Sequence, residues 1–200
     1  MIACMRAPAL RNRQCWAVDK LHKTGAPAIR GEEPNDAGAI ADVVAAAFGS
    51  RAEARLVRAI RSSDHYVPAW SLVAEWEGQI VGHVMVSYAT LLDGARSHRI
   101  TTLSPLAVAP QAQGRGVGSA LVREVAGRVD DHGEPLIVLE GSPAYYGRLG
   151  FEHSVPYGIH ITLPEWAPTE AAQVLRLRRY DPAIRGLVVY PPAFDTVVER

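Results

Sequence analysis

Three glycines at alternate positions stand directly before an apolar-periodic segment, and this feature limits most strongly what the chain can fold into. They are Gly114, Gly116 and Gly118 in PQAQGRGVGSALVREVA, residues 110–126. The first four N–H groups of a helix lack helical partners, and the helix dipole places about half a positive charge there. Without a Cβ atom, the loop lets an anion approach these groups. The segment therefore predicts a phosphate-binding loop between a strand and a helix, with a tight turn for close packing as the alternative.

The two best-known phosphate loops do not fit this segment. A P-loop needs Gly-Lys followed by Ser or Thr, and the chain has no lysine after Lys23. A dinucleotide fingerprint needs G-x-G-x-x-G, whereas the spacing here is G-x-G-x-G. The phosphate must therefore belong to another kind of ligand.

Apolar periodicity on both sides of the loop predicts a mixed α/β domain. We expect helices over 37–48, capped by Asn35 or Asp36, over 51–61 with its four arginines in solvent, and from Val117 onward with Arg123 facing away from the core. A short helix should begin at Pro143 and end at Gly150. The expected strands lie within 27–34, 71–92 as a hairpin, 98–110, 135–141, 157–164, 171–180 and 185–194. Because proline cannot donate to a ladder, Pro105 requires an edge or a bulge.

Composition narrows the class of protein. The 200 residues, 48% hydrophobic and 21% charged, fit one domain. The 21 basic and 21 acidic residues give no argument for nucleic acid or an anionic membrane as a partner. Residues 1–27 hold five basic residues, one acid and both cysteines, and they predict a flexible basic extension before a single domain over 28–200. No apolar run is typical of a secretory signal or a membrane span, so a cytoplasmic protein without a metal site is expected.

Two motifs resemble a known family. Gln113-x-x-Gly116-x-Gly118, preceded by LAVAP and followed by an apolar helix, resembles the acetyl-CoA-binding motif of the GNAT superfamily of N-acetyltransferases. The later segment PAYYGRLGF resembles the second signature of that superfamily. The resemblance runs from about Ala28 to the C-terminus and implies a GNAT-like α/β fold, in which helices flank a central mixed sheet with a splayed strand pair.

The resemblance also implies where acetyl-CoA binds. The backbone of Leu106, Ala107 and Val108 would pair with the pantetheine arm. The pyrophosphate would be wrapped by a second set of residues, namely Gln113, Gly114, Arg115, Gly116, Val117, Gly118 and Ser119, with Arg115 adding charge. Ala112 stands where many relatives carry an aromatic residue.

Catalytic roles follow from the same resemblance. Tyr146 stands where the family places the general acid that assists the leaving thiolate. Glu140, at the end of the apolar run 135–141, is the first candidate for the base, and His83 is the second. Because the domain has no cysteine, direct attack by a primary amine is favoured over a covalent acyl-enzyme.

The acceptor would be a small-molecule or peptide amine, and edge strands in the C-terminal third would allow a homodimer. A non-catalytic acyl-CoA sensor and an interaction domain without a cofactor are the competing functions.

Overall fold

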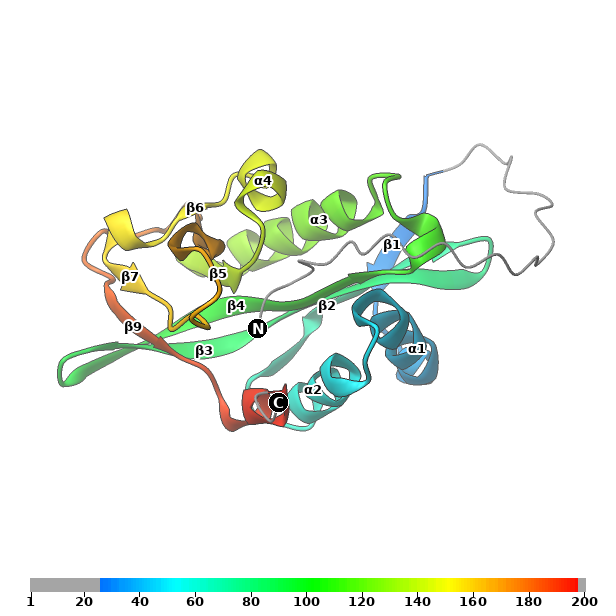
Figure 1. Ribbon diagram of the computed structural model, residues 1–200, viewed down its shortest axis with the longest axis horizontal. Helices are drawn as coiled ribbons and strands as arrows, with labels where there is room; N and C mark the ends of the chain where they lie inside the picture. The colour runs from blue at the N-terminus through cyan, green and yellow to red at the C-terminus, as the bar shows by residue number, and fades with distance from the viewer. Residues whose placement is uncertain (1–25, 198–200) are drawn as a thin grey trace.

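A single mixed sheet of nine strands forms the centre of the computed structural model, which describes residues 26–197 (Figure 1). The strands are β1 (Ala28–Gly31), β2 (Tyr66–Trp76), β3 (Gln79–Asp93), β4 (Arg96–Val108), β5 (Leu136–Glu140), β6 (Glu152–His153), β7 (Ile159–His160), β8 (Ala172–Arg176) and β9 (Gly186–Val189). Their order is β1-β2-β3-β4-β5-β8-β6, and β9 pairs with both β3 and β7. All neighbours are antiparallel except β4 with β5 and β7 with β9. The predicted mixed α/β fold is confirmed.

Helices cover both faces of the sheet (Figure 1). The helices α3 (Val117–His132) and α4 (Pro143–Tyr146) lie on one face, while α1 (Ala37–Phe48) and α2 (Ala52–Arg61) lie on the other. A short 3-10 helix, η6 (Pro192–Val197), follows β9 and packs against α2. The sheet is therefore the middle of three layers.

The apolar periodicity that predicted α3 matches its buried side. Val117, Leu121, Val125 and Val129 are at most 1% exposed. The helix ends at Gly133, which adopts the left-handed conformation that residues with a Cβ atom disfavour. Repetition of an apolar residue at every fourth position is therefore sufficient to identify the face that packs on the sheet.

The predicted defect at Pro105 is a bulge against β3, and it lies where β4 has no paired strand on its other side. Leu103 pairs with Val86 and Leu106 with Val84, so Ser104 and Pro105 together stand opposite Met85. On its other side β4 pairs with β5 only at Thr101–Ile137 and Thr102–Val138. Within the described residues the two strands therefore separate after Thr102, as the resemblance implied.

The C-terminal third contains less strand than expected. The predicted strand in 157–164 shortens to the two residues of β7, and the run 185–194 yields β9 followed by η6. Prolines explain the second result, because Pro191 and Pro192 cannot donate a ladder hydrogen bond. The end of β7 at His160 depends instead on its partner, since only Ile159 and His160 pair with β9. The pairing of β6 with β8 was not predicted, since a two-residue strand carries no periodicity.

The proposed extension 1–27 lies, apart from Ala26 and Pro27, outside the described residues. Across residues 26–197, no helix is both long and apolar enough to cross a bilayer.

Candidate functional site

Glycine is required at the three positions around the start of α3 for two different structural reasons. Gly114 and Gly116 have φ values of 73° and 82°, in the left-handed region that favours glycine. Gly118 has no such φ, but a Cβ atom there would lie 2.6 Å from the Tyr145 hydroxyl. The first two glycines thus shape the loop, and the third allows α4 to approach α3.

The N-terminus of α3 is open to an anion. Gly116 is its N-cap residue, and no described side chain caps the first turn. The first N–H groups of this 16-residue helix therefore keep both their hydrogen-bonding capacity and the positive end of the helix dipole.

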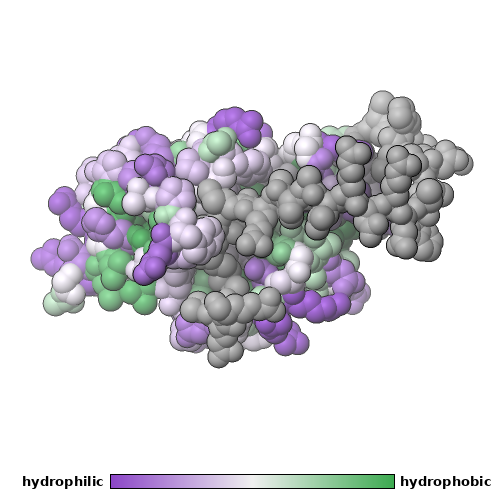
Figure 2. Space-filling model, in the orientation of Figure 1, coloured by the Kyte–Doolittle hydropathy of each residue, from purple (hydrophilic) through white to green (hydrophobic). Residues whose placement is uncertain are grey.

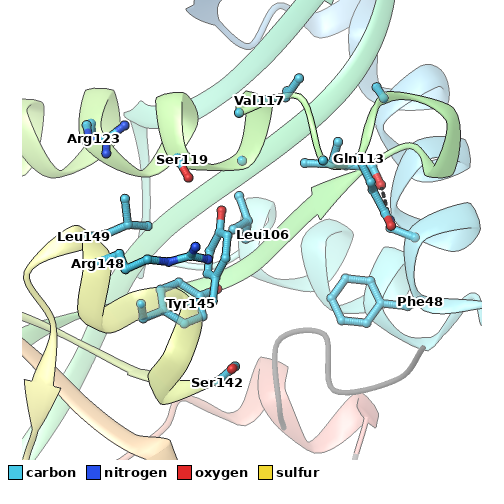
Figure 3. A pocket seen from close by; sticks show the side chains of 17 residues that line it. Phe48, Leu106, Gln113, Val117, Ser119, Arg123, Ser142, Tyr145, Arg148 and Leu149 are labelled. Atoms are coloured by element: carbon cyan, nitrogen blue, oxygen red, sulfur yellow. Dashed lines mark hydrogen bonds between the residues drawn. The ribbon is translucent and has the colours of Figure 1, made fainter.

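A cavity of about 630 Å³ lies between this helix end, the part of β4 beyond its last pair with β5, and α4. It is bounded by the C-terminal end of α1, by β4, by the loop and first turns of α3, and by α4 (Figure 3). Its lining residues are Ala47, Phe48, Leu106, Val108, Ala112, Gln113, Gly114, Gly116, Val117, Gly118, Ser119, Arg123, Ser142, Tyr145, Tyr146, Arg148 and Leu149. Most residues expected to bind acetyl-CoA are among them.

Two of the residues expected at the cofactor lie outside this cavity. Ala107 pairs with His83 of β3, which directly follows Gly82. A Cβ atom on Gly82 would contact Val117 and Leu121, so Gly82 faces α3. Because successive residues of a strand point to opposite faces, Ala107 points away from α3. The predicted role of Ala107 concerned its backbone, which this orientation leaves unchanged. Arg115 instead places its guanidinium 5.4 Å from the centre of the Trp76 ring. The charge expected from Arg115 is therefore directed toward Trp76.

Two other arginines line the cavity in its place. Arg123, expected to face away from the core, lies one helical turn after Ser119 on the same side of α3, and Arg148 follows α4 (Figure 3). Positions four apart on a helix share a face, so the spacing of four residues from Ser119 could have identified Arg123 as a residue of the phosphate-binding side. Arg148 gave no comparable signal.

Tyr146 is held rigidly at the inner part of the cavity. Its side chain is 2% exposed and makes edge-to-face contacts with Tyr145 and Phe151, with ring centres 4.9 and 5.5 Å apart. A Cβ atom on Gly141 would lie 2.4 Å from this ring, so the glycine after β5 makes room for it. Packing on three sides fixes the direction of the phenol.

Glu140 lies at the same gap but on the other face of the sheet. It is the last residue of β5 and is 6% exposed. Thr101 pairs with Ile137 on the α3 face, so alternation directs Val138 and Glu140 to the α1–α2 face. Glu140 does not line the cavity; it neighbours Thr102 and Tyr190 instead.

His83 belongs to a separate buried cluster beneath α2. Its Nε2 lies 3.1 Å from the Ser71 hydroxyl and 3.5 Å from Glu32, which also accepts a hydrogen bond from Arg61. Ser71 donates its only hydroxyl proton to Glu32, so Nε2 of His83 donates to Ser71. Burial lowers the pKa of His83, which therefore stays neutral. Arg61 was expected in solvent, and its contact with buried Glu32 corrects that prediction.

Comparison with known proteins assigns the family. A sequence model of the acetyltransferase (GNAT) domain matches residues 28–154. The Escherichia coli protein YhbS, an uncharacterized N-acetyltransferase, is 33% identical over 171 residues, which are 84% of this chain and 98% of YhbS. The chain belongs to the GNAT acetyltransferase family. A second uncharacterized N-acetyltransferase of E. coli, YjhQ, is 38% identical over 120 residues, 60% of this chain and 66% of YjhQ.

Two solved GNAT structures are similar over most of the chain. The structure of YhbS in complex with CoA has a TM-score of 0.75 at 30% identity and covers 88% of this chain and 96% of YhbS. A GNAT acetyltransferase from Brucella melitensis in complex with acetyl-CoA has a TM-score of 0.68 at 32% identity and covers 84% of this chain and 97% of its own. The GNAT fold expected from the motifs is thereby confirmed.

Proposed function

We propose that this GNAT protein transfers the acetyl group of acetyl-CoA to a primary amine. The observation that carries the proposal is one cavity that joins an uncapped helix N-terminus to a buried tyrosine at the β4–β5 gap. The CoA and acetyl-CoA bound by two relatives support the choice of ligand.

The residues around the cavity fit the chemistry of acetyl-CoA. The N–H groups at the start of α3 would bind the pyrophosphate, and Arg123 and Arg148 would add the positive charge that Arg115 directs elsewhere. The backbone of 106–108 would bind the pantetheine arm, because β5 leaves this side of β4 without a strand after Thr102. When bound, acetyl-CoA supplies an activated thioester; the residues of the chain hold it and move protons.

Tyr146 would assist the leaving sulfur. The pKa of an ordinary tyrosine is about 10 and that of an ordinary thiol about 8.5, so complete proton transfer to a thiolate costs about 2 kcal/mol. A hydrogen bond from the phenol to the sulfur as charge develops avoids most of this cost. Acid catalysis of this kind contributes roughly 10²- to 10⁴-fold in rate.

Glu140 would take the proton of the acceptor. An alkylamine is protonated at neutral pH, since its pKa resembles that of lysine, about 10.4. A carboxylate at the gap, on the face opposite the cofactor cavity, can accept that proton without meeting the bound cofactor. His83 is a weaker candidate, because it is fully buried and its Nε2 proton is engaged by Ser71.

The acceptor is proposed only as a class. The chain outside residues 1–27 carries a net charge of −4, which suits a cationic amine. Polyamines, peptide amines, aminoglycosides and small alkylamines share this property, and spermidine, a lysine peptide, kanamycin and ethanolamine represent them in an assay of thiol release.

Calorimetric titration with acetyl-CoA tests the cofactor site, with Ser119→Glu as the variant. A carboxylate in the first turn favours the helix but repels a phosphate bound there. We expect micromolar binding by the natural protein, about −8 kcal/mol, and at least tenfold weaker binding by Ser119→Glu.

Gly127→Glu is the matched control, because it places the same charge on an exposed position of α3 with no atom within 4 Å of the added Cβ. It should bind like the natural protein. Equal affinity of all three proteins would refute the phosphate site, and binding without transfer to any of the four amines would favour an acyl-CoA sensor.

A further inference from the structure

The hydroxyl of Tyr145 lies where three elements of the cavity meet. A Cβ atom on Gly118 would lie 2.6 Å from this oxygen, and 3.4 and 3.6 Å from the side chains of Val108 and Leu106. The hydroxyl is therefore held beside the first turn of α3 and near the part of β4 that no longer pairs with β5. In the proposed function, this is the place where the phosphate site meets the pantetheine site.

The space left by Gly118 accommodates the oxygen of Tyr145 rather than its ring. After the hydroxyl, the atoms nearest to the added Cβ belong to Val108 and Leu106, so no ring carbon of Tyr145 lies closer than 3.6 Å. A phenylalanine at position 145 would therefore leave room for a Cβ atom at position 118. The close approach of the two residues is a property of the hydroxyl group.

The direction of this hydroxyl is fixed by packing. The ring of Tyr145 extends from α4 into the cavity (Figure 3). It makes an edge-to-face contact with the ring of Tyr146, with ring centres 4.9 Å apart and an interplanar angle of 89°. Tyr146 is itself 2% exposed. Because the phenol oxygen lies on the ring axis, holding the ring also holds the oxygen.

The hydroxyl of Tyr145 has a proton to donate. Within residues 26–197 it forms no hydrogen bond, although apolar side chains of β4 lie near it. A polar group in such surroundings costs free energy until it finds a partner. The N–H groups at the start of α3 are donors too, so the missing partner must be an acceptor. A phosphate oxygen can accept from the phenol and from these N–H groups together.

We propose that Tyr145 is a CoA-binding residue, whose hydroxyl donates a hydrogen bond to the phosphate that joins the pantetheine arm. The inference rests on the proposed function, in which acetyl-CoA occupies this cavity. The phenol keeps its proton, and no covalent bond changes. Tyr145 would thus recognise the ligand beside the N–H groups of α3, while Tyr146 acts on the leaving sulfur.

Calorimetric titration of Tyr145→Phe with CoA tests the proposal. The substitution retains the ring contact with Tyr146 and removes only the hydroxyl. We expect the Kd for CoA to rise about tenfold, as for the loss of a hydrogen bond to a charged group. Tyr157→Phe is the matched control, because it removes a tyrosine hydroxyl that donates to Glu152 over 2.7 Å on the surface. Its Kd should equal that of the natural protein.

Two shorter ligands identify the group that the hydroxyl contacts. 4′-Phosphopantetheine carries the phosphate in question and pantetheine lacks it, and the affinity of each is measured by its displacement of CoA. Tyr145→Phe should weaken the binding of 4′-phosphopantetheine about tenfold and that of pantetheine less than twofold. A merely structural role of Tyr145 would weaken the binding of both ligands equally.

The outcomes separate this inference from the proposed function. An unchanged Kd for CoA in Tyr145→Phe, or an equal loss with pantetheine, would overturn the role of Tyr145 and leave the proposed transferase intact. The expected losses without acetyl transfer to any of the four amines would support Tyr145 and overturn the transferase. A natural protein that binds no CoA would overturn both proposals.

Discussion

At the scale of single residues, Tyr146 is the side chain whose chemistry is easiest to isolate. Its ring is held by Tyr145 and Phe151, and a phenylalanine would keep both contacts while losing only the hydroxyl. We expect Tyr146→Phe to lower kcat at least tenfold and to leave the affinity for acetyl-CoA within about twofold. Steady-state kinetics and calorimetry measure the two quantities.

The control for this prediction is Tyr88→Phe. It removes a hydroxyl of β3 that donates a hydrogen bond to Glu134 over 3.0 Å. His83 is the only catalytic candidate on β3, so Tyr88 lies outside the proposed mechanism. Its kcat should match that of the natural protein. If Tyr146→Phe is equally active, Tyr146 has no part in the mechanism.

Residue identities could be predicted from the sequence more readily than residue partners. The motif located Tyr146, and eight of the predicted cofactor residues line the cavity. Periodicity cannot show which element will approach a given side chain, and this explains the differences. Arg61 contacts Glu32. Asp36 is the N-cap residue of α1, as one of the two predicted candidates, but its side chain pairs with Arg30 at 2.6 Å and makes no capping hydrogen bond to the helix.

At the scale of elements, the contact between α3 and α4 depends on the absence of one carbon atom. Glycine to alanine inside a helix ordinarily stabilises a protein by about 0.5–1 kcal/mol. We expect this gain at Gly127, where nothing lies near the added Cβ. Gly118→Ala should instead destabilise by about 1–3 kcal/mol, as overpacking does. Urea unfolding gives both values.

Tyr145→Phe provides the internal check on that explanation. It removes the hydroxyl 2.6 Å from the added Cβ, so in this background Gly118→Ala should become neutral or stabilising. A loss of stability that persists without the hydroxyl would show that Gly118 is required for another reason.

The ends of helices and strands could be predicted where a glycine or proline stands at the point at which the apolar periodicity of the sequence changes. Gly49 and Gly150 end helices as expected, and Pro105 marks a real deformation of β4. The place where β4 leaves β5, and the shortness of β7, depend on which strands lie on either side. Such long-range pairings leave no mark in the local sequence.

At the scale of the whole molecule, the cluster of Glu32, Ser71, His83 and Arg61 joins β2, β3, α2 and the end of β1. Burial acts to raise the pKa of Glu32, but hydrogen bonds with His83, Arg61 and Ser71 outweigh it and lower the pKa to about 2. The ionised carboxylate therefore stabilises the fold above pH 4.5, and this contribution is lost as the pH falls toward 2.

We expect the free energy of unfolding to fall by up to about 3 kcal/mol from this group between pH 5 and 2. Protonation of His83 acts in the same direction, since burial lowers its pKa. Urea unfolding across this range should show a shallower pH dependence in Glu32→Gln than in the natural protein or in Glu165→Gln, an exposed control. Parallel curves for all three would contradict the assignment.

The prediction of a homodimer stays a prediction. Its reason was free strand edges in the C-terminal third. There β8 lies between β5 and β6, and β9 lies between β3 and β7, so the free edges belong to the two-residue strands β6 and β7. Exposed apolar side chains gather instead on the outer side of β3 and β9, where Leu92, Leu187 and Val189 are 40–44% exposed (Figure 2). Sedimentation equilibrium would determine the oligomeric state.

The early separation of β4 from β5 gives the central sheet an unusual property. Beyond Thr102, β4 pairs with β3 on one side except at the bulge of Ser104 and Pro105, while no strand of the described residues pairs with its other side. Amide groups cannot be exchanged for others by substitution, so recognition built from them tolerates wide drift in side chains. The surface of β4 that is proposed to bind the pantetheine arm would therefore depend on the strand topology more than on the identity of its side chains.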